Sequence, residues 1–453
     1  MDINGVIIRH VIFPAMEAAK GNRIREKLKF LKKTESLNRQ ELAALQGEKL
    51  RSLLLHCIEH VNAYKEYAFL KDEILDNPFR ALEKFPVLTK QAFMEKADQF
   101  IADGVDTSRL IANRTGGSTG EPVRFYLDRN TVEYYEAARW RGLSWWDINI
   151  GDRSVMIWGS PLELNQQEQR SYRLKERYLK NRIMIPAYSL SPESIANYVK
   201  ITNNYKPKYI YGYASALHIF AQLMINGGYR LNVQLKGVLS TAETLHDYQR
   251  QDIEKAFGCP VINEYGARDA GILAYECPLG GMHITAENAV MEIVDIKTGE
   301  ILPYGNSGLV TVTDLNNYVM PRLRYQVGDI AALSEDSCPC GISLPLLQSL
   351  SGREDDTFIT KDGTFVHGHY FNHIARNLSG ISRFQVIQHD RDNLTLKVVP
   401  STQFNENEME VFKKGIYDKM GQVNLKIEYV DKISPSPSGK YRYAIREFPL
   451  DIH

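Results

Sequence analysis

The sequence lacks the features that would point to a membrane-spanning, secreted or nucleic-acid-binding protein. Its 55 Lys and Arg residues equal its 55 Asp and Glu residues, so no net charge attracts nucleic acid or acidic lipid. The apolar run in residues 1–21 is interrupted by Arg9, His10 and Pro14, so it is too short for a membrane span or a signal peptide. We therefore expect a cytoplasmic protein with no nucleic-acid partner. The N-terminal run either packs on the body of the protein or docks peripherally on a membrane.

Cysteine is scarce, and its number argues against a disulfide framework. The chain of 453 residues has five cysteines, an odd number in what we expect to be a cytoplasmic protein. Cys57 and Cys259 fall in helical or strand-like contexts and are expected in the core.

The other three cysteines are grouped with a histidine. Five residues separate Cys277 from His283, and one residue separates Cys338 from Cys340. Three thiols and one imidazole match a closed, tetrahedral, structural Zn²⁺ site. The alternative is a set of reduced, partly buried thiols in loops.

The chain also lacks the two common glycine-rich nucleotide motifs. No Gly-Lys-Ser/Thr closes a Walker loop and no G-x-G-x-x-G occurs, which disfavours a generic kinase. Glycine is nevertheless dense in NRTGGSTGEPVRFY, residues 113–126, where backbone N–H groups and hydroxyls could converge on an anion. By themselves these residues fit a phosphate loop or a flexible linker equally well. The candidate phosphate-loop residues are Thr115, Gly116, Gly117, Ser118, Thr119 and Gly120.

The order of apolar patterns predicts an α/β protein. Helical spacing dominates from about Arg23 to Ala97, and strand-like and helical runs alternate from about Ser154 to Val312. The last hundred residues have their own α+β pattern. We expect a large domain over residues 1–354, with a helical N-terminal arm of about 100 residues and mixed or parallel sheets flanked by helices. A small, mobile α+β domain is expected over residues 355–453.

Five segments follow the glycine-rich stretch in order, and together they carry a family resemblance. They are STAETL (240–245), NEYGARD (263–269), RYQVGD (324–329), GREDD (352–356) and SPSGKYR (436–442). The set resembles the ordered motifs of the adenylate-forming superfamily, which includes acyl-CoA synthetases, peptide-synthetase adenylation domains and luciferases. TGGSTGEPVRFY and the N-terminal region look most like the phenylacetate–CoA ligase branch, particularly its relatives in capsule and exopolysaccharide biosynthesis.

The resemblance implies a role for each motif. The glycine-rich loop would hold the β- and γ-phosphates of ATP, Asp329 and Arg353 would bind the ribose, and Asp355 would lie at the hinge. Lys440 would neutralise the oxygen that bridges the acid and the α-phosphate, and Asp269 would bind Mg²⁺. Tyr265 would offer a flat face to adenine. The other implied nucleotide contacts are Ala242, Glu243, Asn263, Glu264 and Gly266.

Several residues depart from the family pattern or have a purely structural alternative. Glu121 stands where a basic residue often follows the loop, and Asp269 is one methylene shorter than the usual glutamate. Arg268 replaces a small hydroxyl residue and could contact the α-phosphate or the acid directly, so we count it among the catalytic candidates. The alternatives are a turn aspartate at Asp329, a core-edge aromatic at Tyr265, a solvated lysine at Lys440 and a surface ion pair at Arg353.

The segment YIYGYASALHIFAQ, residues 209–222, resembles the wall of the acid pocket in this branch. Aromatic side chains suit an aryl or apolar acid, tyrosine hydroxyls suit a polar one, and both also occur in ordinary cores. The candidate pocket residues are Tyr135, Tyr211, Tyr213, Ala214 and Ser215.

The resemblance implies an ATP-dependent ligase that converts a small carboxylic acid to an acyl-adenylate and releases pyrophosphate. The acyl group would then pass to coenzyme A, or alternatively to an amine such as an amino sugar. A third interpretation is a nucleotide-binding protein that has lost catalysis, with Arg268 and Asp269 marking the loss. A homodimer is the common default for such a chain.

Overall fold

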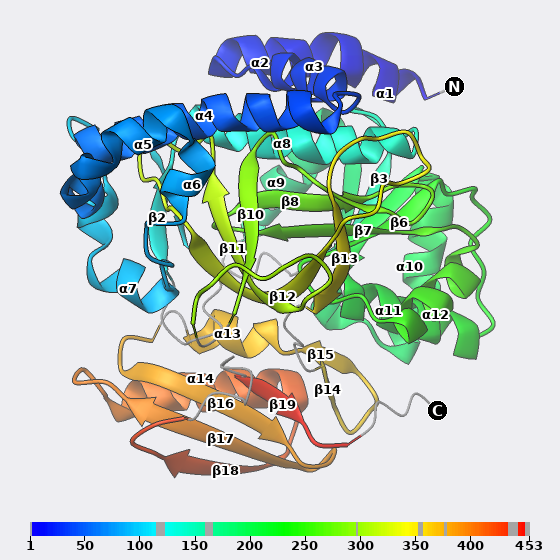
Figure 1. Ribbon diagram of the computed structural model, residues 1–453. Helices are drawn as coiled ribbons and strands as arrows, with labels where there is room; N and C mark the ends of the chain where they lie inside the picture. The colour runs from blue at the N-terminus through cyan, green and yellow to red at the C-terminus, as the bar shows by residue number, and fades with distance from the viewer. Residues whose placement is uncertain are drawn as a thin grey trace.

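The computed structural model of this chain describes residues 2–114, 123–158, 166–295, 298–351, 357–375, 378–433 and 443–448. Helices from the N-terminal third cover one side of a large mixed sheet, and a smaller domain with its own sheet lies at the opposite end (Figure 1). The expected α/β class, with a second and smaller α+β unit, is confirmed.

The N-terminal region is mainly helical, as its apolar spacing predicted. The 22-residue helix α4 (Arg39–His60) begins with a capping box, in which the Asn38 side chain accepts from the Glu41 N–H and Glu41 accepts from the Asn38 N–H. The buried face of α4, which includes Leu50, Leu53 and Leu54, packs into the largest apolar core. The other helical segments here are α1 (Ile3–Ile7), the π-helical η1 (Ile8–Ile12), α2 (Phe13–Lys20), α3 (Ile24–Thr34), η2 (Asn62–Leu70), α5 (Lys71–Asp76), α6 (Pro78–Leu82), α7 (Lys90–Glu95), η3 (Ala97–Phe100) and η4 (Thr107–Arg109).

The central sheet has eleven strands, and one half of it is parallel. Its order is β10-β11-β12-β13-β9-β8-β7-β6-β5-β3-β4. The parallel strands are β3 (Ser154–Trp158), β4 (Arg182–Pro186), β5 (Tyr209–Tyr213), β6 (Gly237–Thr241) and β7 (Val261–Ala267). The helical segments between or beside them are α8 (Arg129–Trp145), α9 (Gln166–Leu179), η5 (Ala187–Ser189), α10 (Pro192–Tyr205), α11 (Ala214–Asn226) and α12 (Asp247–Phe257).

The parallel strands are covered by side chains on both faces, as parallel sheets require. On one face, Tyr209, Leu239 and Ile262 pack with residues of α3 and α8. On the other face, apolar residues of β3, β5, β6 and β7 pack with α10, α11 and α12. This two-sided burial explains why these strands read as nearly continuous apolar runs.

The second half of the sheet corrects the expectation that strands and helices alternate as far as Val312. From β7 onward the strands pair antiparallel, and no helix lies between β7 and β13 in the described residues. Short connections can join antiparallel neighbours, whereas a parallel pair needs a long crossover. These strands are β8 (Gly271–Glu276), β9 (Met282–Ile284), β10 (Ala289–Val294), β11 (Gly308–Asp314), β12 (Tyr325–Ser334) and β13 (Leu346–Ser351). A separate hairpin joins β1 (Ile111–Arg114) to β2 (Arg124–Leu127).

The C-terminal unit has its own sheet and its own apolar core. Its strand order is β18-β17-β16-β19, and the predicted hairpin at residues 382–400 is confirmed as β16 and β17. The position of the domain boundary near Asp355 and the mobility of the unit stay predictions. Its elements are β14 (Thr357–Ile359), β15 (Phe365–His367), α13 (His369–Ala375), β16 (Ile381–Gln388), β17 (Asn393–Pro400), α14 (Glu406–Met420), β18 (Asn424–Tyr429) and β19 (Ala444–Arg446).

A buried ion pair joins α8 to the segment before β10, and α3 is hydrogen-bonded to it. Arg141 of α8 donates to Glu287 over 2.5 Å, and Thr34 of α3 donates to the same carboxylate oxygen over 2.8 Å. The Arg141 and Glu287 side chains are 1% and 0% exposed. Removing one member of such a pair leaves the other charge buried and uncompensated.

We therefore expect Glu287→Ala to lower the free energy of unfolding by about 3–5 kcal/mol, measured by urea denaturation. The control is Glu26→Ala, which removes an exposed pair with Arg23 and should change the free energy by less than about 1 kcal/mol. An apolar replacement of both partners, Arg141→Met with Glu287→Leu, should recover much of the loss. A Glu287→Ala protein as stable as wild type would contradict this role.

Candidate active site and metal centre

The nucleotide and acid motifs meet where the parallel strands end. Tyr213 at the end of β5 lies opposite Thr241 at the end of β6, and Thr241 lies opposite Glu264 of β7. Ligands of open α/β sheets bind outside the carboxyl ends of the strands. This edge is therefore where the topology favours a binding site.

Two hydrogen bonds join NEYGARD to RYQVGD. Tyr265 donates to Asp329 over 3.1 Å, and Tyr325 donates to Asp269 over 2.8 Å. Both bonds connect the end of β7 and the loop after it to the start of β12, so two motifs more than fifty residues apart form one surface. The predicted adenine residue and the predicted ribose residue are thus direct neighbours.

Asp269 is buried, and its surroundings lower the pKa of its carboxyl. Burial raises the pKa of its carboxyl, but the charges of Lys90 and Arg322 and the Tyr325 hydrogen bond outweigh burial and lower the pKa. An ionised carboxylate supplies the hard oxygen that Mg²⁺ prefers, so the residue fits the predicted metal role. Because the Tyr325 hydroxyl donates to Oδ2 of this carboxylate, Mg²⁺ would have to bind the other oxygen, Oδ1.

The adenine-motif loop contacts the start of the predicted acid segment. Glu243 accepts a 2.8 Å hydrogen bond from the backbone N–H of Ser215, the second residue of α11. Ala242 has a φ of 68°, a left-handed conformation that is unusual for a residue with a Cβ. Strained backbone conformations of this kind cluster in loops that bind ligands.

The Glu264 side chain is satisfied by protein groups. Its carboxylate accepts hydrogen bonds from Arg139 at 3.1 Å and from Thr241 at 2.9 Å, and Tyr211 donates to it over 3.4 Å. Its predicted nucleotide contact would therefore have to use the backbone, and that contact stays a prediction. Asn263 and Gly266, two other predicted nucleotide contacts, are held through their backbones. The Asn263 N–H donates to Glu276 over 2.8 Å, and a Cβ at Gly266 would lie 2.6 Å from the Gly271 carbonyl oxygen.

Two of the predicted acid-pocket residues, Tyr211 and Tyr213, stack on a third aromatic side chain. Trp158 at the end of β3 stacks on Tyr213 with ring centroids 3.9 Å apart, and on Tyr211 at 5.5 Å. Ala214 and Ser215 follow directly and are buried. The hydroxyl of Tyr135, by contrast, donates to Asp314 of β11 over 2.5 Å, so it holds α8 to the sheet. Substrate contacts of all these residues stay predictions.

Arg268 lies beside the entry to the glycine-rich stretch. Its guanidinium donates to the carbonyl oxygen of Arg114 over 3.2 Å, and the side chain is exposed. Arg114 is the last described residue before the predicted phosphate loop, so the position is compatible with a charge near the phosphates. The phosphate-loop residues Thr115, Gly116, Gly117, Ser118, Thr119 and Gly120, together with Arg353, Asp355 and Lys440, lie outside the described residues.

Two buried arginines next to these motifs were not anticipated. Arg322 donates to the Asp269 carbonyl oxygen over 2.5 Å, and its guanidinium lies 4.8 Å from the centre of the Phe125 ring. Arg324 forms a buried ion pair with Glu292 at 3.1 Å. The closely spaced arginines in PRLRYQVGD, residues 321–329, were a visible signal, but only the fold shows that both are buried.

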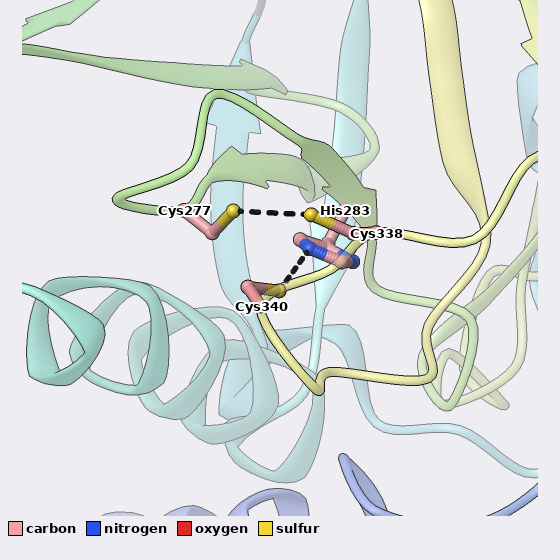
Figure 2. A group of neighbouring side chains, drawn as sticks. All are labelled: Cys277, His283, Cys338 and Cys340. Carbon is pink, nitrogen blue, oxygen red and sulfur yellow. Dashed lines mark hydrogen bonds between the residues drawn. The ribbon is translucent and has the colours of Figure 1, made fainter.

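The cysteine and histidine residues converge as the spacing predicted. Cys277 follows β8, His283 lies on β9, and Cys338 and Cys340 lie in the loop between β12 and β13 (Figure 2). The four ligand atoms lie within 4.8 Å of one another. The Sγ atoms of Cys277 and Cys338 are 3.6 Å apart, and His283 Nε2 is 3.2 Å from Cys340 Sγ. Zn–S bonds of about 2.3 Å in a tetrahedron require similar separations, so the residues fit zinc.

A further contact orients the histidine. His283 Nδ1 lies 3.1 Å from the carbonyl oxygen of Leu344, which selects the tautomer with its proton on Nδ1. Nε2 is then free of hydrogen and points toward the thiols. With four protein ligands, such a site has no open position for substrate.

In the parts of the chain that the structure describes, no helix combines the length and the apolar character needed to cross a bilayer.

Comparisons with known proteins agree with this geometry. The family described as the CapK C-terminal domain matches residues 358–447. Protein CapK of Staphylococcus aureus is 27% identical over 380 residues, which cover 80% of each chain. The phenylacetate-coenzyme A ligase of Thermus thermophilus is 25% identical over 348 residues, covering 72% of this chain and 74% of the relative.

A solved structure has the same fold over most of its length. The 2-hydroxyisobutyryl-CoA ligase in complex with R3-HIB-AMP superimposes with a TM-score of 0.58 at 20% identity, covering 91% of both chains. The ordered motifs and the sequence relatives make the chain similar to the adenylate-forming superfamily, in the branch that contains the phenylacetate–CoA ligases and CapK, and the solved structure shares its fold.

Proposed function

We propose that this protein is an ATP-dependent ligase that activates a carboxylic acid as an acyl-adenylate. The observation that carries the proposal is the Tyr265–Asp329 hydrogen bond, which places the predicted adenine and ribose residues side by side at the carboxyl edge of the sheet. The similarity to phenylacetate-coenzyme A ligases and to a ligase solved with an acyl-adenylate supports this activity.

In the first step a carboxylate oxygen attacks the α-phosphorus of ATP. The new bond joins the acid to AMP, the bond between the α-phosphorus and the bridging oxygen breaks, and pyrophosphate leaves. Both reactants are anionic, so the protein must supply positive charge and alignment. Lys440 would supply charge at the reacting oxygens, and Arg268 lies beside the predicted phosphate loop to add more. Mg²⁺, held by Asp269, would offset phosphate charge.

Asp329 would position the nucleotide in this step. Its carboxylate already accepts one hydrogen bond from Tyr265, and an ionised carboxylate has further lone pairs for the two ribose hydroxyls. Trp158, Tyr211 and Tyr213 would form one wall for the acid. Zn²⁺ at the four-ligand site would hold the β8–β9 turn to the loop after β12 and take no part in the chemistry.

In the second step the acyl group would pass to coenzyme A. The thiolate attacks the acyl carbon, the bond to the AMP oxygen breaks, and AMP leaves. The phenylacetate-coenzyme A ligase relatives support coenzyme A as acceptor. An amine acceptor is the alternative, and a curated relative named indoleacetate–lysine synthetase is 30% identical over 134 residues, or 29% of this chain.

The decisive experiment is pyrophosphate release from ATP across a panel of aryl, aliphatic, hydroxylated and amino acids. Release that depends on one class of acid would support the proposal and identify the substrate class. Product analysis with and without coenzyme A, and with added amines, would then assign the acceptor. Nucleotide binding without turnover on any acid would favour the lapsed nucleotide-binding protein.

Asp329→Ala is expected to raise the KM for ATP at least about tenfold, because hydrogen bonds to a charged group contribute about 1.5–3 kcal/mol each. The KM for the acid should change much less, since Asp329 is predicted to contact the ribose and not the acid. Initial rates of pyrophosphate release at varied ATP would measure this split. Asp336→Ala, an exposed aspartate in the loop after β12, is the matched control. Equal KM values for ATP in Asp329→Ala and wild type would contradict the ribose assignment.

A further inference from the structure

The first helical segments expose apolar side chains in a pattern that ordinary packing does not explain. Ile3, Val6, Ile7 and Val11 are 70%, 43%, 44% and 61% exposed. They lie three or four residues apart along α1 and η1, so they share one face of the helix. A surface helix of a soluble protein normally turns such a stripe toward the core.

The opposite face of the same segment is attached to the body of the protein. Ile8 is buried, and Arg9 donates to the Ile150 carbonyl oxygen and to Asp152 over 3.0 and 3.1 Å. Gly5 lies so close to Gly151 that a Cβ at Gly5 would be 2.7 Å from the Gly151 carbonyl oxygen. The rotation of this helix is therefore set by polar and backbone contacts, and the apolar stripe cannot turn inward without breaking them.

The N-terminal segment that carries this stripe is rich in positive charge. Residues 2–37 contain eight Lys and Arg against four Asp and Glu, a net charge of +4, and because the whole chain is balanced the remainder carries −4. The ion pairs of this region use Arg9, Arg23 and Arg25. The lysines left exposed and without an ion pair among the described residues are Lys20, Lys29, Lys32 and Lys33.

The continuous helical run of α1, η1 and α2 and the following helix α3 lie at the outer end of the molecule. We call them the N-terminal helix pair (residues 3–34). The chain reverses at Gly21, where φ is 65°, and α3 returns beside α2, with Glu17 bonded to the backbone N–H of Arg25. Figure 1 shows the pair at the end farthest from the C-terminal domain. A partner bound there would not obstruct movement of that domain.

We propose that the N-terminal helix pair docks on the surface of an anionic lipid bilayer. An outward apolar stripe in a lysine-rich helical region is the composition of an interfacial segment, which inserts its apolar face among the headgroups and attracts acidic lipid. A second copy of the chain fits less well, because a two-fold contact through this face would bring two +4 regions together. The inference does not depend on the proposed ligase activity.

The test is co-sedimentation of the full chain with vesicles of phosphatidylcholine, with and without phosphatidylglycerol. We expect wild type to bind phosphatidylglycerol vesicles at least about tenfold more tightly than neutral ones, and the binding to fall at high salt. Two variants should each lose this binding. One is the double variant Ile3→Ser/Val11→Ser, and the other is the triple variant Lys29→Gln/Lys32→Gln/Lys33→Gln. The matched controls are Phe69→Ser, a 77% exposed apolar residue elsewhere, and Lys255→Gln, an exposed lysine on α12.

Two results would overturn the proposal. One is a wild-type protein that stays in the supernatant with both kinds of vesicle. The other is a dimer in light scattering that becomes a monomer in the Ile3→Ser/Val11→Ser variant without any vesicle binding, which would make a second copy the occupant. Melting temperatures equal to wild type would show that the variants are folded, because all five substituted side chains point to solvent.

Discussion

Lys440→Ala is expected to lower acid-dependent pyrophosphate release by at least about 100-fold, the effect of removing one group that stabilises charge in a transition state. The lysine would contact the oxygen between the acid and the α-phosphate, where negative charge from both reactants accumulates. The only other basic side chain of the SPSGKYR motif is Arg442, and its planar guanidinium differs from an ammonium group in shape and reach. The change should therefore appear in kcat more than in either KM.

A second measurement separates loss of this role from misfolding. When a synthetic acyl-adenylate is supplied with coenzyme A, the Lys440→Ala protein should still form the thioester. We expect the small domain to rotate about the predicted hinge at Asp355 and to take Lys440 out of the site before that step. Lys432→Ala, an exposed lysine in the segment before the motif, is the control and should leave both half-reactions unchanged. Pyrophosphate release at the wild-type rate in Lys440→Ala would refute the assignment.

Loss of the metal is expected to have the largest effect on stability. Purified wild type should contain one zinc per chain by elemental analysis, and Cys338→Ser should contain none. Because structural zinc sites contribute many kcal/mol to folding, chelation or Cys338→Ser should lower the melting temperature by more than about 10 °C. A long-range connection would be lost, since the site joins the β8–β9 turn to the loop between β12 and β13.

Cys259→Ser is the matched control for this experiment. Cys259 is buried but lies outside the cluster, so its substitution should keep the zinc and cost little stability by comparison. Absence of stoichiometric zinc, with wild-type stability after chelation, would show that the four residues are only reduced thiols and a histidine in neighbouring loops. Retention of zinc by Cys338→Ser would instead mean that the ligand set is wrong.

Local patterns in the sequence were sufficient for most helices and for the parallel strands. Asn38 with Glu41 marks the start of α4, and apolar runs such as residues 209–213 and 237–241 mark strands buried on both faces. Helix caps and alternation depend on residues a few positions apart, so they can be read without the fold. The antiparallel half of the sheet was predicted less well, because strand direction depends on which strands pair and not on the strands themselves.

The candidate site, like the fold, was predicted only in part from the sequence. The order of six motifs indicates similarity to the adenylate-forming superfamily, and the spacing of Cys277, His283, Cys338 and Cys340 indicates a metal site. The contacts between motifs depend on the tertiary structure: the Tyr265–Asp329 bond spans 64 residues, and the Glu264 carboxylate is occupied by Arg139 from a separate helix.

Residue types and their spacing thus determined which chemistry this chain can carry, while packing decided which side chains meet and which are exposed. Arg322 and Arg324 resemble surface arginines in the sequence, yet both are buried against partners that are distant in the sequence. Ile3 and Val11 resemble core residues, yet they face solvent, because Gly5, Ile8 and Arg9 hold the other side of the helix to the body. The physical reason is that burial and pairing depend on the free energy of the whole folded chain, to which distant residues contribute as much as neighbours do.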